Sequence, residues 1–143
     1  MGTALVDTTV LYAAGNRRAA QHELAHEIVR RADEGELPSL RVPGVVLTET
    51  MNGLRRDVGH DTAVGILKRL QEGKYVDFEL EPPAVWKRGF ATFEKVERLS
   101  FADAVPITST RHHGIEYVYT FDDDFDGIDG IGRLATPDNP FAP

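Results

Sequence analysis

Short apolar runs alternate along the chain with longer segments in which apolar residues recur every three or four positions. The first run, residues 3–6, is partly β-branched and predicts a buried strand that ends at Asp7. Apolar side chains then recur at helical spacing over residues 19–32, which predicts an amphipathic helix with Leu24 on its buried face. The chain therefore opens as a strand followed by a helix.

The same periodicities predict the elements that follow. Val76, Phe78 and Leu80 alternate with polar residues, so the strand that contains them is expected to bury these three side chains. The tail after Arg133 is short and proline-rich. The predicted strands cover residues 40–43, 75–80 and 116–120, and the predicted helices cover residues 45–58, 61–70, 82–99 and 100–114.

Strands that alternate with helices in this way predict an α/β fold with a mainly parallel sheet of four or five strands. With 143 residues and no internal repeat or linker, residues 1–143 are expected to form one domain. No apolar run approaches the length of a membrane-spanning helix, and the N-terminus has no signal-like segment. These features predict a soluble, cytoplasmic protein that does not bind membranes.

The absence of cysteine means that any bound metal needs oxygen or histidine ligands. The net charge of -7 argues against nonspecific coating of a polyanion by a basic surface. Clustered carboxylates that hold divalent cations also make a chain acidic, and they allow a nucleic-acid substrate to bind through the metals. The acidic net charge therefore does not decide whether the protein binds nucleic acid.

Four carboxylates stand in apolar contexts, two at the ends of predicted strands and two on predicted helix faces. Asp7 and Asp122 follow the strands, and the carboxyl ends of parallel strands converge on one edge of a sheet. Glu49 lies three and four residues after two valines, which places it on the face expected to enter the core. A buried carboxylate without a partner is unfavourable, so we expect a cation or a hydrogen-bond partner there.

Asp103 also lies on an apolar helical face, four residues after Leu99 and four before Ile107. Ser100 fits a helix N-cap whose third residue is acidic, so capping alone also explains Asp103. Pro106 interrupts the helical pattern and predicts a bend. Together, the four carboxylates are best explained by a bound divalent metal.

Four blocks, in order along nearly the whole chain, resemble the PIN domain and especially VapC-like toxins. The fourth block, Thr-Phe-Asp-Asp-Asp-Phe, is the most specific of them. The blocks are Leu5-Val6-Asp7-Thr8, Val46-Leu47-Thr48-Glu49, Leu99-Ser100-Phe101-Ala102-Asp103-Ala104 and Tyr119-Thr120-Phe121-Asp122-Asp123-Asp124-Phe125-Asp126.

The resemblance implies a three-layer α/β/α nuclease domain that cleaves RNA phosphodiester bonds with Mg²⁺ or Mn²⁺. It implies that Asp7, Glu49, Asp103 and Asp122 are catalytic metal ligands and that Asp124 is a further ligand. Thr8 and Thr120 would support these carboxylates. It also implies a homodimeric toxin inhibited by a small antitoxin protein that covers the acidic site, although a housekeeping RNA-processing nuclease would have the same sequence features.

A competing motif, His22-Glu23-Leu24-Ala25-His26, matches the H-E-x-x-H helix of zinc metalloproteases. On the predicted helix, His22 and His26 lie on a polar stripe with Arg30, opposite the expected buried face. No convincing third ligand follows them. We therefore expect a solvated surface here rather than a zinc site.

A second competing motif, Asp122-x-Asp124-x-Asp126-Gly127, matches the first half of a calcium-binding EF-hand loop. The twelfth position, which needs a bidentate glutamate, is Arg133, and the preceding segment has the pattern of a strand. A calcium-binding module is therefore the alternative that is not an enzyme.

Trp86, Phe90 and Phe93 recur at helical spacing, and we expect them in the core rather than on a surface that stacks nucleic-acid bases. Basic residues occur in pairs that could line a path for phosphates, but charged pairs on helices are usually solvated, and we expect this for most of them. The pairs are Arg17-Arg18, Arg55-Arg56 and Lys87-Arg88, together with the run Arg111-His112-His113.

Overall fold

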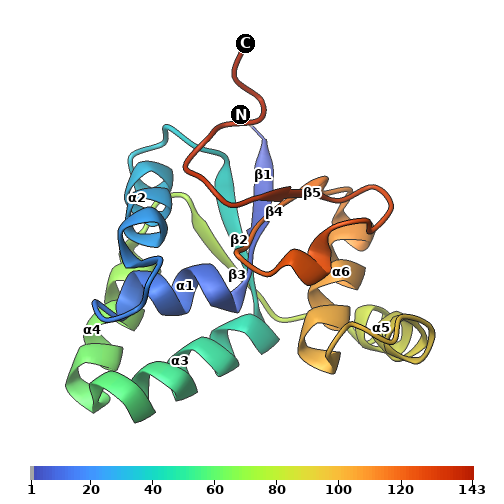
Figure 1. Ribbon diagram of the computed structural model, residues 1–143, viewed down its shortest axis with the longest axis horizontal. Coiled ribbons are helices and arrows are strands. Elements are labelled where there is room, and N and C mark those ends of the chain that lie inside the picture. The colour runs from blue at the N-terminus through green and yellow to red at the C-terminus, as the bar shows by residue number, and fades with distance from the viewer. Residues whose placement is uncertain (1) are drawn as a thin grey trace.

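Five parallel strands form the centre of the molecule, as the computed structural model shows for residues 2–143 (Figure 1). Their order across the sheet is β3-β2-β1-β4-β5, so the chain adds strands on one side of β1 and then continues on the other. The adjacent carboxyl ends of β1 and β4 therefore form the switch point of the sheet. The strands are β1 Thr3–Val6, β2 Ser39–Pro43, β3 Val76–Glu79, β4 Tyr117–Tyr119 and β5 Gly132–Leu134.

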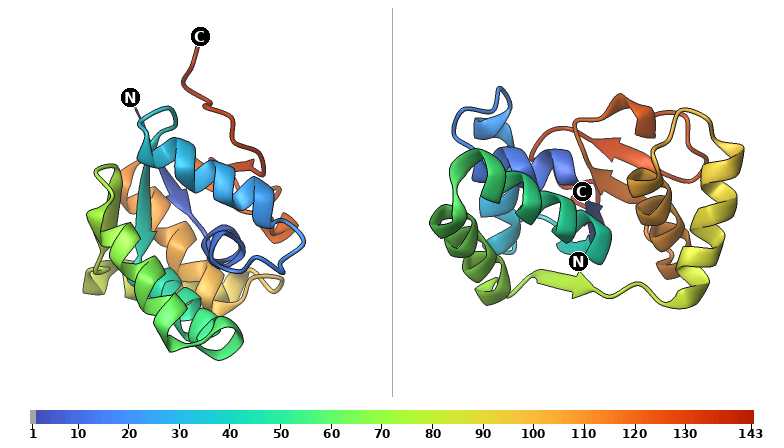
Figure 2. Two further views of the ribbon diagram at one scale, coloured as in Figure 1. Left: turned by 90° about the vertical axis from the view of Figure 1, so that its left-hand side faces the viewer. Right: turned by 90° about the horizontal axis from the view of Figure 1, so that it is seen from below.

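Helices pack on both faces of this sheet (Figure 2). Among residues 2–143, no helix combines the length and hydropathy needed to cross a membrane. The helices are α1 Thr8–Gly15, α2 His22–Asp33, α3 Gly44–Val58, α4 His60–Glu72, α5 Pro83–Lys95 and α6 Phe101–His113, with a short 3-10 helix η1 at Asp123–Phe125.

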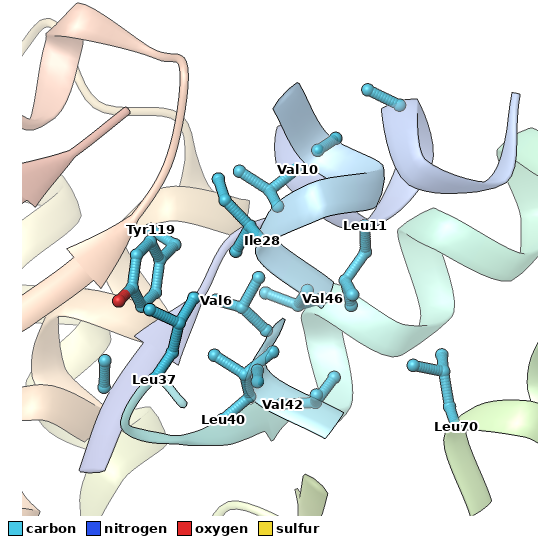
Figure 3. Packing of buried hydrophobic residues seen from close by; sticks show 14 residues of the cluster. Val6, Val10, Leu11, Ile28, Leu37, Leu40, Val42, Val46, Leu70 and Tyr119 are labelled. Atoms are coloured by element: carbon cyan, nitrogen blue, oxygen red, sulfur yellow. The ribbon is translucent and has the colours of Figure 1, made fainter. Parts of the chain in front are cut away.

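Alternate residues of β1 enter different cores, because successive side chains of a strand point to opposite faces. Val6 packs with Val10 of α1 and Ile28 of α2 in the larger cluster, which Figure 3 shows. Leu5 packs on the other face with Ile107 of α6. Both faces of β1 are thus covered, which explains why its sequence is an unbroken apolar run. The predicted α/β fold with a parallel sheet is confirmed.

Two elements of the fold were not predicted. Helix α1 begins directly after Asp7 and contains Thr8, Thr9 and Val10, which are β-branched and have low helix propensity. Strand β5 has only three residues, and each is only partly buried. Its backbone is fixed by pairing with β4, so its local sequence carries no alternating pattern.

The predicted orientation of the third strand was wrong. Phe78 is 39% exposed and Leu80 is 92% exposed, whereas Glu79 is buried. Strand β3 lies at the edge of the sheet and ends at Glu79, so Leu80 lies outside it. Glu79 instead receives polar partners from β2 and α6, and these partners allow a carboxylate to replace an apolar side chain.

The prediction that the rings of α5 belong to the core was also wrong for two of the three. Phe90 is 49% exposed and Phe93 is 46% exposed, while Trp86 is partly buried. The helix packs on α6 through Val85 and Gly89, which are buried. The aromatic stripe therefore flanks the interface between α5 and α6 instead of filling it.

Helix α6 continues through Pro106, although proline removes one backbone donor. The polar run after it is buried, and each hydroxyl has a partner. The Thr108 hydroxyl donates to the Ala104 carbonyl at 2.9 Å, and the Ser109 hydroxyl donates to Glu79 at 2.6 Å. Thr110 similarly donates to a backbone carbonyl one turn earlier. These bonds allow a polar sequence to occupy a buried helix.

Candidate active site

The candidate site lies where β1 and β4 end beside each other. Asp7 follows β1 directly, and its backbone N–H donates to the Tyr119 carbonyl of β4 at 3.0 Å. Thr120 and Asp122 follow β4. Because the two strands are parallel neighbours, these residues meet at the carboxyl edge of the sheet, as the sequence predicted.

Asp7 is almost completely buried, with 2% of its surface exposed. Its Oδ2 accepts hydrogen bonds from the Thr120 hydroxyl at 2.9 Å and from the Thr9 hydroxyl at 3.1 Å. Burial raises the pKa of Asp7 above its usual value, and these hydrogen bonds only partly oppose that effect. The carboxylate is therefore held firmly in place, and no basic side chain among residues 2–143 forms an ion pair with it.

Two threonines join the strand ends into one unit. The Thr9 hydroxyl accepts from the Phe121 backbone N–H at 3.0 Å, and the Thr120 hydroxyl accepts from the Asp122 backbone N–H at 3.0 Å. Their oxygens lie 3.2 Å apart. Thr120 was expected to support the carboxylates, but Thr9 was missed. The signal for Thr9 is its place in the first turn of α1, a helix that was not predicted.

Asp103 approaches the same edge from α6. Its backbone N–H donates to the Ser100 hydroxyl at 3.1 Å, so Ser100 caps the helix as predicted. Burial raises the pKa of the Asp103 carboxyl to about 7, and the negative charges of Asp7, Asp122 and Glu49 add to this effect. The cap uses the backbone of Asp103, while its carboxylate lies in the field of the other three.

Glu49 joins this group, but the prediction that it enters the core was wrong. Its side chain is exposed, because the buried face of α3 is formed by Val46, Thr50 and Leu54. Its Oε1 accepts a hydrogen bond from the Thr8 hydroxyl at 2.8 Å. This bond ties the α3 carboxylate to the start of α1, beside Asp7.

The acidic run after β4 adds further carboxylates. Asp122 Oδ1 accepts from the Asp124 backbone N–H at 2.9 Å and thereby caps η1. The potential ligand atoms of Asp122, Asp123 and Asp124 lie within 4.8 Å of one another. Asp123 was not a predicted site residue, because the resemblance assigned ligands only to its two neighbours.

In the part of the chain that the structure describes, no basic side chain neutralises these carboxylates. Within residues 2–143, none of the five predicted site residues forms an ion pair. Arg133 is close enough for Asp122 to affect its pKa, but it pairs with Asp126 at 2.8 Å. An all-oxygen donor set with excess negative charge fits Mg²⁺ or Mn²⁺, which prefer carboxylate and water ligands.

The same ion pair counts against an EF-hand loop. Asp126, the third acidic position of the calcium motif, is bound by Arg133, the residue at the twelfth position. Strand β4 precedes the loop, where an EF-hand would have a helix. The geometry therefore groups Asp122 and Asp124 with the strand-end site.

The H-E-x-x-H segment lies at the start of α2, away from this edge. Leu24 is 43% exposed, so its predicted burial was wrong, and Ala25 takes its place in the core. The ring centroids of His22 and His26 are 5.7 Å apart. Among the described residues, no third metal-ligating side chain joins them, since the acidic triplet after β4 is the only such group.

The PIN domain family model matches residues 4–131, and no curated protein matches the chain significantly. Among solved structures, the chain is similar to VapC20 of Mycobacterium tuberculosis, a toxin that cleaves the sarcin-ricin loop. The two are 30% identical with a TM-score of 0.73, over 85% of this chain and 92% of that one.

Two further structures share the fold at lower identity. A toxin-antitoxin complex from Klebsiella pneumoniae is 20% identical with a TM-score of 0.62, over 95% of this chain and 98% of that one. VapBC2 from Rickettsia felis, bound to a DNA fragment from its promoter, is 10% identical with a TM-score of 0.70, over 92% and 97%. The family match over most of the sequence and the identity to VapC20 agree: the chain belongs to the PIN domain family.

Proposed function

We propose that this protein is a metal-dependent endoribonuclease, a hydrolase that cleaves RNA phosphodiester bonds. The observation that carries the proposal is a set of carboxylates at the switch point of a PIN-domain sheet that form no ion pair with any described basic residue. VapC20, to which the chain is 30% identical, is a toxin that cleaves RNA. In this proposal, residues 1–143 form a single nuclease domain.

Asp7, Glu49, Asp103 and Asp122 would hold Mg²⁺ or Mn²⁺, with Asp124 as a further ligand. A bound divalent ion would activate water and stabilise the charge that develops on the scissile phosphate. The protein contributes a preorganised frame. Thr9 and Thr120 fix the Asp7 carboxylate, and Thr8 fixes Glu49, so the ligands need little rearrangement when a cation enters.

Asp103 has a second role in this proposal. Its pKa of about 7 in the metal-free protein reflects burial and three neighbouring negative charges. A cation at the site would stabilise the ionised form, so metal binding would release a proton from this carboxyl near neutral pH. In this proposal, the binding of a metal ion at the site is therefore coupled to the protonation state of the Asp103 carboxyl.

The biological setting that we propose is a toxin-antitoxin pair in the cytoplasm, with the nuclease acting as a homodimeric toxin. Support comes from solved relatives that are toxin-antitoxin complexes. The acidic cluster also gives a small basic partner protein a charged surface to cover. A housekeeping nuclease would cleave RNA equally well, and it would not arrest growth when expressed without its partner.

The test is cleavage of labelled RNA by the purified protein with Mg²⁺, with Mn²⁺ and with a chelator. We expect cleavage only with metal, and we expect Asp7→Asn to reduce kcat by about 100-fold or more, as loss of a key electrostatic group does. Asp77→Asn, an exposed acidic residue of β3, is the matched control and should leave kcat unchanged. Metal-independent cleavage, or full activity in Asp7→Asn, would contradict the proposal.

A further inference from the structure

Four aromatic rings gather where α5 meets the start of α6. Phe101 lies at the centre, with ring-centroid distances of 5.5 Å to Trp86, 5.9 Å to Phe90 and 5.6 Å to Phe93. We call these four residues the aromatic face. Phe90 and Phe93 are each nearly half exposed, so parts of their rings are open to solvent.

The closest approach of α5 to α6 is made by a small residue, not by the exposed rings. The helix contacts α6 through Val85 and Gly89, which are buried. A Cβ atom at Gly89 would lie 3.2 Å from Val105 Cγ2, so this glycine allows the two helices to approach closely. Phe90 and Phe93 contact Phe101 of α6 with part of each ring and leave the rest in solvent. Large apolar groups left in water usually mark a binding surface.

The aromatic face adjoins the candidate active site through α6. Phe101 precedes Asp103 by two residues, so their Cα atoms are at most about 7.6 Å apart. In Figure 1, α5 lies beside the end of α6 that also approaches α3, the helix that carries Glu49. An RNA strand whose phosphate is held at the carboxylates therefore has neighbouring nucleotides within reach of these rings.

Charge on the same segment favours a polyanion. Residues 83–101 contain four basic and two acidic side chains, in a chain whose net charge is -7. Lys87, Arg88 and Lys95 are exposed, and none of them forms an ion pair within the described residues. Open rings beside unpaired cations are the combination that single-stranded nucleic acid binds, with bases stacked and phosphates neutralised.

We propose that the aromatic face stacks unpaired bases of the RNA substrate, with Phe90 and Phe93 as the platform and Lys87 and Arg88 as phosphate contacts. This inference rests on the proposed ribonuclease function and adds a second contact surface for the same substrate, next to the cleavage position. A second copy of this chain is the competing occupant. The surface disfavours it, because a twofold contact through α5 would bring the same unpaired cations together.

The test compares two double variants of the full-length protein. Phe90→Leu with Phe93→Leu keeps apolar surface and removes the rings, whereas Phe90→Ala with Phe93→Ala removes both. Phe78→Leu, at an exposed ring of the edge strand β3, is the matched control. Binding of a fluorescein-labelled single-stranded RNA is measured by anisotropy, and KM and kcat are measured from cleavage of the same RNA.

We expect both double variants to bind the single-stranded RNA about tenfold more weakly, as loss of base stacking predicts. KM should rise by a similar factor with little change in kcat, while binding of a duplex of the same length and the Phe78→Leu control should be unchanged. Unaltered binding in the leucine variant overturns the inference. Light scattering tests the competing occupant. If the dimer dissociates in the alanine variant but persists in the leucine variant, and RNA affinity falls only where the dimer is lost, the aromatic face binds a second copy of the chain.

The two proposals fail separately. If the wild type binds RNA but does not cut it, the ribonuclease proposal fails, and the anisotropy comparison still decides the role of the rings. If the wild type cuts RNA and the leucine variant has the same KM, only the aromatic-face inference fails.

Discussion

Glu79 contacts α6 and Asp103 belongs to it, yet their surroundings shift the pKa values of the two carboxyls in opposite directions. Burial alone would raise the pKa of Glu79, but hydrogen bonds from Ser109, His113 and Arg41 together lower it. Burial raises the pKa of Asp103 to about 7, and three other carboxylates reinforce the shift. The partners of Glu79 within the chain outweigh its burial, whereas the one hydrogen bond from Ser100 does not outweigh the burial of Asp103 and the charges around it.

The contrast bears on the role that we propose for Asp103. Arg41 Nε lies 2.9 Å from Glu79, and the Ser109 hydroxyl lies 2.6 Å away, so the chain itself compensates this negative charge. Asp103 has no basic partner in the described part of the chain. A perturbed carboxylate that the fold does not satisfy is the kind of group that a ligand completes.

Exchanging the two carboxylates for amides should give opposite results, and this is the largest effect that we expect. Asp103→Asn should lower kcat for RNA cleavage by about 100-fold or more, while the metal-free protein stays as stable as the wild type or becomes more stable. Glu79→Gln should keep most activity and lose about 1–3 kcal/mol of unfolding free energy. This loss is smaller than for a fully buried pair, because Arg41 and His113 are 28% and 27% exposed.

Urea unfolding with a chelator measures the stabilities, and initial cleavage rates measure the activities. Glu27→Gln serves as the control, since its ion pair with Arg30 is exposed and should contribute little. A marked loss of stability in metal-free Asp103→Asn would mean that this carboxylate holds the fold together, and the contrast with Glu79 would disappear.

Sequence patterns found Asp7 and Asp122 because each follows a buried apolar strand, a signal carried by neighbouring residues. The order of strands and helices was predictable for the same reason. Burial of Glu79 was not, because its partners lie 30 to 38 residues away in the chain. The apolar Phe78 and Leu80 on either side gave the opposite expectation.

In the acidic site too, the sequence did not predict contacts between residues that are far apart in the chain. Glu49 was expected in the core because its spacing from two valines suggested an inward face, but α3 is rotated so that Thr50 is buried instead. Thr9 was missed because its partners, Asp7 and Phe121, come together only when β1 and β4 pair. The position of an acidic residue relative to the strands predicts whether it lies near the site. Its burial and hydrogen-bond partners depend on tertiary contacts.

Divalent metal should stabilise the Asp103 region and leave the Glu79 region unaffected. A ligand that binds only the folded state adds about 2.7 kcal/mol at 100 times its dissociation constant, so the Tm of the wild type should rise with Mn²⁺ or Mg²⁺. Asp103→Asn should shrink this rise, and Glu79→Gln should keep it. Scanning calorimetry with each ion checks this. An undiminished response to Mn²⁺ in Asp103→Asn would remove Asp103 from the metal site and leave only the helix cap.

The smallest effect that we expect is a difference between the wild type and Asp103→Asn in how the free energy of unfolding depends on pH, measured without metal. The folded pKa of Asp103 is raised to about 7 from an ordinary value of 3.8, so its protonated form stabilises the fold at low pH and this contribution is lost as pH rises from about 4 to 7. The pKa of Glu79 is lowered, so its contribution is present above its ordinary pKa of 4.5 and is lost as pH falls below that value. Between pH 5 and pH 7.5, Asp103→Asn should therefore lose less stability than the wild type, by about 1 kcal/mol after allowance for solvent screening. Urea unfolding of both proteins in chelator at the two pH values gives this difference directly, and histidine titration cancels because the two chains share every histidine. Parallel pH dependence of the two proteins would show that Asp103 titrates normally, and that its carboxylate neighbours do not repel it as the structure indicates.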